Sequence, residues 1–323
     1  MVVMMLRRRD RRDRISAAPL ALAAGTLAGA LLLSACGGSS SATSAGGKVD
    51  VVAAFYPLQY LAEQIGGDHV KVTDLTAPGT EPHDLELTAK QVAAVQGAGA
   101  VLYLKGLQPT VDKAVAQAAG KHVVDAAALS PLVDHHLDEG TDASGQGAAH
   151  AGDPHIWLDP TRYAAVAKGV GAELAKADPA HAADYQRNTD ALVAKLATLD
   201  QDFATGLKSC TGKSFVTSHA AFGYLADHYG LQQIAINGVD PESEPTPARL
   251  AQIQQSAKAN GVTTIFFETL VSPKLADSVA KDLNLKTAVL DPLEGVKDEK
   301  ADDYFTVMQR NLTNLQAALG CTA

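Results

Sequence analysis

The chain has 323 residues, of which 27 are basic and 36 acidic, and its formal net charge is −9 at pH 7. Residues 1–35 carry six arginines and two aspartates, so the remainder has 21 basic and 34 acidic residues and a net charge of −13. This balance argues against nucleic acid as a partner, because binding to phosphates requires a basic surface.

The first 35 residues have the order of a secretory signal peptide. Six arginines within Arg7–Arg14 precede an apolar, Ala/Gly-rich run, Ala17–Leu33, which is short for a membrane-spanning helix. Leu33–Cys36 then resembles the lipobox of bacterial lipoproteins, in which the signal is cut before a cysteine that carries a lipid. The alternative is an ordinary cleaved signal with an incidental cysteine. The arginine pairs also suggest twin-arginine export, but the usual flanking residues are missing, which favours the general secretory route.

Residues 36–48 form a predicted flexible tether. Gly37–Gly47 is uncharged and rich in Gly, Ser and Ala, as flexible linkers are. A lipid on Cys36 would hold the protein on the outer face of the cell membrane without a spanning helix. About 275 residues remain beyond the tether, which is enough for two lobes.

From Val49 onward, short apolar runs alternate with helical periodicity, which predicts parallel sheets covered by helices. The first set of strands is expected at Val49–Ala54, Val70–Leu75, Val101–Tyr103 and His122–Asp125. The helices between them are expected at Leu58–Gly66, Thr88–Gly97 and Thr110–Ala119. Asp134–Asp153 is rich in Gly, Asp, Ser and His and interrupts the pattern as a loop.

The pattern then restarts after two helices, Thr161–Ala177 and His181–Leu207. Strands are expected at Ser214–Thr217, Leu231–Ile236, Thr263–Phe267 and Thr287–Leu290. Helices are expected at Ala221–Tyr229, Thr246–Asn260, Pro273–Leu283 and Asp303–Leu319. We therefore expect an α/β fold with two lobes, 49–178 and 208–323, joined by a long bridging helix within 179–207.

Four positions far apart in the chain have the residue types of one metal site: His83, His155, His219 and Asp291. Each lies in a short segment punctuated by Pro or Gly, where a helix or strand should end. Three imidazoles and one carboxylate suit Zn²⁺, and ligands of open parallel sheets bind beyond the carboxyl ends of strands. Glu81 is an alternative carboxylate to Asp291, ranked lower because Pro82 stiffens its link to His83.

Three further histidines, His135, His136 and His150, lie in the acidic loop beside His155. They are candidate accessory ligands that would capture Zn²⁺ loosely near the cleft. The alternative is a solvated loop that contains histidines by chance. Candidates for orienting the ligand rings are Glu268, Asp84 and Asp159.

Two cysteines remain beyond the signal, Cys210 and Cys321. An even pair in an exported protein predicts a disulfide, which here would fix the chain end to the second lobe. The alternative, a thiolate ligand or nucleophile, has less support, because neither cysteine has a neighbouring histidine or a Cys-x-x-Cys partner.

Five segments resemble, in order, those of the metal-binding lipoproteins that serve zinc and manganese ABC importers, the cluster A-I solute-binding proteins. They are PGTEPHDLE at 78–86, DPHIWLDP at 153–160, TSHAAFGYLA at 217–226, IFFETLVSPK at 265–274 and LDPLEG at 290–295. The similarity extends over Val49–Leu319. Leu85 and Leu87 depart from the family, which often has an aromatic residue and a proline at these positions.

The resemblance implies that His83, His155, His219 and Asp291 bind one divalent metal between two lobes. It also implies a monomeric receptor that passes the metal to a membrane permease and is not an enzyme. Zn²⁺ is expected over Mn²⁺, because manganese members commonly have a carboxylate at the position of His219 and imidazoles suit zinc better.

The sequence also bears on two other classes of function. One is a zinc hydrolase with the same ligands, for which the sequence has no His-Glu-x-x-His motif. Ser218 also lacks the Gly-x-Ser-x-Gly context of a nucleophile elbow. The other is a metal-dependent adhesin, a role assigned to some relatives, about which no sequence feature gives information.

Overall fold

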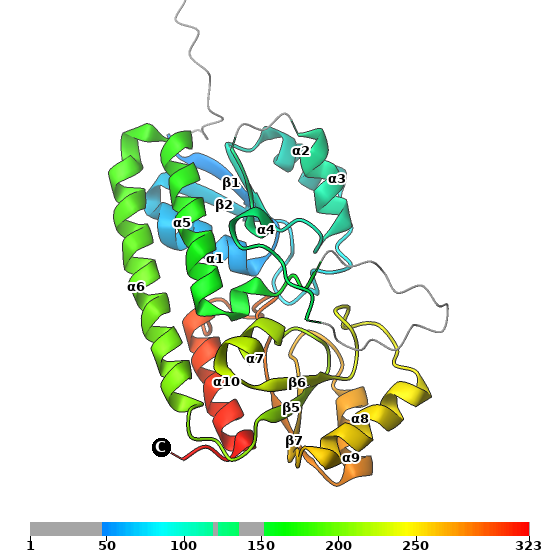
Figure 1. The fold of residues 1–323 in the computed structure, drawn as a ribbon. Helices are drawn as coiled ribbons and strands as arrows, with labels where there is room; N and C mark the ends of the chain where they lie inside the picture. Colours follow the sequence, from blue (N-terminus) through cyan, green and yellow to red (C-terminus); the bar gives the residue numbers. More distant parts are fainter. Residues whose placement is uncertain (1–46, 119–121, 136–151, 323) are drawn as a thin grey trace, which may run out of the picture. The chain divides into compact units, whose positions relative to one another are not determined.

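The computed structural model describes residues 47–118, 122–135 and 152–322. It contains two four-stranded parallel sheets with helices around them (Figure 1). Several predicted features lie outside the described residues: the signal, the lipidation site Cys36, almost all of the tether, His136 and His150. Among the residues described, no helix is both long and apolar enough to cross a membrane.

The first sheet has the strand order β2-β1-β3-β4, and all of its pairings are parallel. Its strands are β1 (Val49–Ala53), β2 (Val70–Asp74), β3 (Ala100–Tyr103) and β4 (Val123–Asp125). The helices of this lobe are α1 (Tyr56–Gly66), α2 (Ala89–Gly97), α3 (Pro109–Gln117) and the short α4 (Ala126–Leu129). The central strands are almost fully buried, as the apolar runs predict.

The second sheet repeats this topology with the order β6-β5-β7-β8. Its strands are β5 (Ser214–Thr217), β6 (Gln232–Ala235), β7 (Thr264–Phe267) and β8 (Lys286–Val289). Its helices are α7 (Gly223–Tyr229), α8 (Pro247–Ala259), α9 (Lys274–Leu283) and α10 (Tyr304–Leu319). In each sheet, successive strands are added first on one side of the first strand and then on its other side. The order therefore reverses between β1 and β3 and between β5 and β7. Ligands of open α/β sheets bind at such a point.

Two long helices, α5 (Pro160–Ala177) and α6 (Ala182–Gly206), lie between the sheets in the sequence. They run side by side, and α6 continues past α1 to reach α10 (Figure 1). Their close approach depends on Gly171, where an added Cβ would lie 2.1 Å from Thr189 Oγ1. The predicted α/β fold with two sheets and a long helix is confirmed.

One hydrophobic cluster extends through both lobes, and a smaller one lies within the second lobe. The larger buried cluster contains apolar side chains from both, including Leu61, Leu102, Phe222 and Leu315. Trp157 joins them directly, because its Nε1 donates to Pro292 O at 2.7 Å and its carbonyl accepts from the Tyr304 hydroxyl at 2.6 Å.

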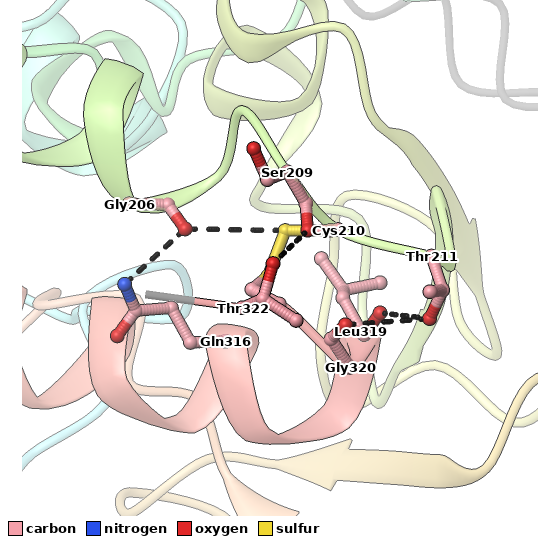
Figure 2. Close-up of a disulfide and its surroundings, with 9 residues drawn as sticks. Gly206, Ser209, Cys210, Thr211, Gln316, Leu319, Gly320 and Thr322 are labelled. Atoms are coloured by element: carbon pink, nitrogen blue, oxygen red, sulfur yellow. Dashed lines mark hydrogen bonds between the residues drawn. A yellow bond between two sulfur atoms is a disulfide. The ribbon is translucent and has the colours of Figure 1, made fainter.

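A disulfide joins Cys210 to Cys321, as the sequence predicts (Figure 2). The two cysteines also face each other in an isolated antiparallel bridge. Gln316 of α10 donates to Gly206 O at the end of α6, at 3.2 Å. The end of the chain is therefore fixed to the segment between α6 and β5.

Candidate metal centre

Donor atoms of His83, His155, His219 and Glu294 converge at one point between the lobes. One ligand atom from each lies within 4.8 Å of the others. Glu294 Oε1 lies 2.9 Å from Nε2 of His155, 3.2 Å from Nε2 of His219 and 3.3 Å from Nε2 of His83. A single divalent cation could bind all four groups, since three imidazoles and one carboxylate make a complete tetrahedral set.

The four residues come from loops that the topology brings together. His83 lies between β2 and α2, and His155 lies just before the 3₁₀ turn Ile156–Leu158 that leads into α5. His219 follows β5 by two residues, and Glu294 lies in the loop after β8. The structure thus brings together the three histidines that the sequence singled out.

The structure differs from the sequence-based expectation at the fourth position. Asp291 is not in the group, because its Oδ2 accepts from the Thr269 hydroxyl at 2.8 Å and its Oδ1 accepts from Leu293 N at 2.8 Å. The chain then turns at Leu293, which has φ of 57°. The side chain of Glu294 enters the site instead and is fully buried.

Glu81, the alternative carboxylate, belongs to a neighbouring group of acids with Glu268 and Glu294. Its Oε1 accepts from His83 N at 2.8 Å. Burial, and then repulsion from Glu294, raise the pKa of Glu81 to about 9. Glu81 therefore lies beside the histidine group and is not a member of it.

Buried carboxylates hold the far nitrogens of two histidine rings. His155 Nδ1 lies 2.7 Å from Asp153 Oδ1, and His219 Nδ1 lies 2.8 Å from Glu268 Oε1. The Ser218 hydroxyl donates to the same Glu268 oxygen at 2.7 Å. These contacts aim each Nε2 at the centre of the site, as outer carboxylates do around metal-binding histidines.

Of the predicted orienting residues, only Glu268 contacts a histidine of the group. Asp159 instead caps α5 and lies 2.9 Å from His228 Nδ1. Asp84 is exposed and lines a pocket beside His83. Asp153 was not predicted, although its place two residues before His155 is a local signal for it.

The buried charges set the protonation of the group. Burial lowers the pKa of His219, but Glu268 and Glu294 outweigh it and hold this pKa well above its usual value. Burial likewise opposes the charge on His155, while contacts with Asp153 and Glu294 raise its pKa. Glu294 has a pKa well below its usual range, against the effect of burial, because of His219, His155 and His83. A bound divalent cation would therefore replace protons.

Access to the group is from the His83 side. The side chain of His83 is 10% exposed, whereas those of His155 and Glu294 are 0% exposed. His83 lines a pocket with residues from both lobes: Asp84, Gly106, Leu107, Pro109, Leu132, Gly152, Pro154, Val239 and Asp240. This pocket therefore borders the least buried residue of the group.

His135 of the predicted accessory loop lies close to the group without joining it. Its Nδ1 is 2.8 Å from Asp153 Oδ2, and its Nε2 is 3.4 Å from Asp227 Oδ2. Asp153 thus contacts His135 through one oxygen and His155 through the other.

The fold and site are those of a two-lobed solute-binding protein with a buried, histidine-rich centre. The chain belongs to the family of the periplasmic zinc-uptake complex component A, whose model matches residues 51–318.

Curated relatives carry matching names. The high-affinity zinc uptake system protein ZnuA of Bacillus subtilis is 37% identical over 306 residues, which are 90% of this chain and 94% of the relative. The zinc-binding protein AdcA of Streptococcus pyogenes is 39% identical over 287 residues, 84% of this chain. The match covers 56% of AdcA, so this chain spans about half the length of that relative.

Solved structures have the same fold. The Zn(II)-bound ZnuA-like domain of Streptococcus pneumoniae AdcA matches 84% of this chain and 99% of that domain, with a TM-score of 0.70 and 34% identity. The laminin-binding protein Lmb of Streptococcus agalactiae matches with a TM-score of 0.74 and 30% identity, covering 84% of this chain and 99% of that one. Lmb is described as bifunctional, with adhesin and metal-transporting activity.

Proposed function

We propose that the protein is an extracytoplasmic receptor that binds Zn²⁺ and delivers it to the membrane permease of an ABC importer. The observation that carries this proposal is the buried group of His83, His155, His219 and Glu294. Membership of the zinc-uptake family supports it. The ion is the transported cargo and not a resident cofactor.

The ligand types favour Zn²⁺ over Mn²⁺. Imidazoles are better ligands for zinc, whereas Mn²⁺ prefers oxygen donors and higher coordination numbers. Here three of the four groups are imidazoles, and Asp153 and Glu268 hold two of them in place.

A catalytic role has weaker support. A zinc hydrolase keeps one coordination position open for water. In this group Glu294 Oε1 faces all three histidines and takes that position. We therefore propose binding and release rather than hydrolysis.

We further propose that the receptor is a monomer anchored by a lipid on Cys36 after removal of residues 1–35. Residues 36–48 are the tether, 49–178 and 208–323 the lobes, and 179–207 the bridge. A Cys36→Ala variant should then be released from membranes, as fractionation would show. Retention of this variant in the membrane fraction would count against the anchor.

Metal analysis of the purified mature protein tests the proposed cargo. Protein prepared in metal-replete medium should contain about one zinc per chain, and His219→Ala should lose more than about 100-fold in zinc affinity. A matched control is His122→Ala, since His122 lies outside the group and contacts Glu173. Absence of metal from the wild type, or unchanged affinity in His219→Ala, would contradict the proposal.

Delivery to a permease has a separate test in cells. A strain without the gene for this receptor should take up less radioactive zinc at low external concentration. The wild-type gene should restore uptake, and the His219→Ala gene should not. Equal uptake with both genes would contradict the receptor role.

A further inference from the structure

We propose that Asp291 is a positioning residue that aims Glu294 at the three histidines by fixing a left-handed turn at Leu293. The inference rests on the proposed function, in which Glu294 is a ligand of the transported metal. It gives Asp291, the carboxylate nearest the end of β8, a role that is not metal binding.

The carboxylate of Asp291 spans the turn. One oxygen accepts from the backbone N–H of Leu293 at 2.8 Å, two residues along the chain. The other accepts from the hydroxyl of Thr269 at 2.8 Å. Aspartate characteristically fixes turns through a hydrogen bond to the backbone two residues ahead. Both oxygens are therefore used in holding the loop, one along the chain and one across to the loop after β7.

The backbone of Asp291 is fixed as well. Asn311 of α10 accepts from Asp291 N at 2.9 Å and donates to Asp291 O at 2.7 Å. Asn311 is itself buried. From the other side, Trp157 donates to Pro292 O at 2.7 Å. The residues before the turn are thus held by a helix of one lobe and a tryptophan of the other.

Leu293 shows why such a support is needed. Its φ of 57° lies in the left-handed region, which leucine disfavours because its Cβ crowds the backbone. Among the described residues only Asn284 is another non-glycine residue with positive φ, and it ends α9. A strained residue persists where its surroundings fix it, and such residues cluster at binding sites.

The consequence of the turn appears at the next residue. Glu294 Oε1 lies between 2.9 and 3.3 Å from three histidine Nε2 atoms. Because Leu293 directly precedes Glu294, its conformation sets where the Glu294 side chain starts. If Leu293 relaxed to an ordinary conformation, the carboxylate would leave this point, while Asp153 and Glu268 would still hold the rings of His155 and His219.

A double-mutant cycle between Asp291 and Glu294 tests the inference. Asp291→Ala and Glu294→Ala should each weaken zinc binding by about 10- to 100-fold. The double variant should bind no more weakly than Glu294→Ala alone, because Asp291 acts only through Glu294. Affinities that multiply in the double variant, or wild-type affinity in Asp291→Ala, would overturn the inference. If Asp291 supported the fold in general and not Glu294 in particular, the two losses of zinc affinity would multiply in the double variant.

Two further variants distinguish a specific loss of zinc affinity from a loss of folding. Asp291→Asn keeps an oxygen that can accept from Leu293 N, so it should retain affinity within about tenfold of the wild type. Asp298→Ala is the matched control, because Asp298 is an exposed acid of the same loop that only caps Lys300 N. Asp291→Asn as weak as Glu294→Ala, in a folded protein, would also overturn the inference.

A metal-free crystal structure of Asp291→Ala separates this inference from the proposed function. Leu293 should leave the left-handed region, and Glu294 Oε1 should move out of hydrogen-bond distance of His155 Nε2. If both stay in place, the positioning role is wrong even though the protein binds zinc. Failure of the wild type to bind zinc would instead contradict the proposed function, and the turn geometry would still decide the role of Asp291.

Discussion

His155 and His219 are each held between two carboxylates. Their Nδ1 atoms face Asp153 and Glu268, and both Nε2 atoms face Glu294. The pKa of each ring is consequently raised despite its burial. Protons and a metal ion compete for the same nitrogens, so protonation opposes binding.

The pH dependence of zinc affinity follows from this competition. A raised pKa means that the rings hold their protons to a higher pH than the usual histidine value of about 6.5. Zinc affinity should therefore already fall as pH drops towards 6.5 from above. Competition titrations with a chelator of known pH dependence would measure this. An affinity that stays constant from pH 8 to about 6 would contradict the prediction.

A substitution at Glu268 tests what its negative charge contributes to zinc affinity. Glu268→Gln keeps an oxygen that can accept from His219 but removes the charge, so zinc affinity should fall by about 10-fold or more. Glu242→Gln, a change at an exposed residue outside the site, serves as control. Isothermal titration of both variants against the wild type would measure the difference. Equal affinities would show that the charge of Glu268 does not strengthen zinc binding through His219.

At the scale of elements, α5 and α6 pack extensively against each other. Gly171 faces Thr189 so closely that no side chain fits between them. Thr189 is buried and donates its hydroxyl to Tyr185 O at 2.7 Å. The position of α6 relative to the first lobe therefore depends on a glycine.

Substitution of this glycine gives a stability prediction. Gly171→Ala should lower the free energy of unfolding by about 1–3 kcal/mol, because the added methyl group overlaps Thr189 Oγ1. Thr189→Ala in the same chain should recover part of the loss by removing that oxygen. Urea unfolding followed by circular dichroism would measure both. Gly97→Ala is a control, since a Cβ there meets no atom within 4 Å. A loss no larger than that of the control would contradict the prediction.

At the scale of the whole molecule, the disulfide closes a long loop far from the site. Cys210 precedes β5, whereas His219 follows the opposite end of that strand. The bridge links residues 111 positions apart, and closing a long loop destabilises the unfolded chain. Its effect should therefore be on stability and not on the metal site.

Removal of the disulfide tests whether it affects stability without affecting the metal site. The double variant Cys210→Ala, Cys321→Ala should lose about 2–4 kcal/mol of unfolding free energy. Its zinc affinity should stay within about twofold of the wild type, because the strand end that positions His219 is unchanged. Denaturant titration and zinc titration on one preparation would measure both quantities. Unchanged stability, or a large loss of affinity, would contradict this assignment.

The sequence alone determined much of this protein. Alternation of short apolar runs with helical periodicity fixed the two sheets, because a parallel sheet needs buried strands and covering helices. The sequence also singled out His83, His155 and His219, which the structure brings together, since each stands in a short motif at the end of an element. The disulfide could also be predicted from the sequence, because disulfide formation depends on residue type and compartment.

Only the tertiary structure decided which carboxylate meets the histidines. By sequence, Asp291 directly follows a strand and is the natural choice, whereas Glu294 is one acid in a loop. The position of Glu294 depends on the left-handed backbone of Leu293. It also depends on the hydrogen bonds that Asn311 makes to Asp291 and that Trp157, from the other lobe, makes to Pro292. Trp157 and Pro292 are 135 positions apart, and Asn311 and Asp291 are 20 apart. No local pattern encodes where such contacts direct a side chain. The same holds for Glu268 and His219, which meet because β5 and β7 are neighbours in the sheet.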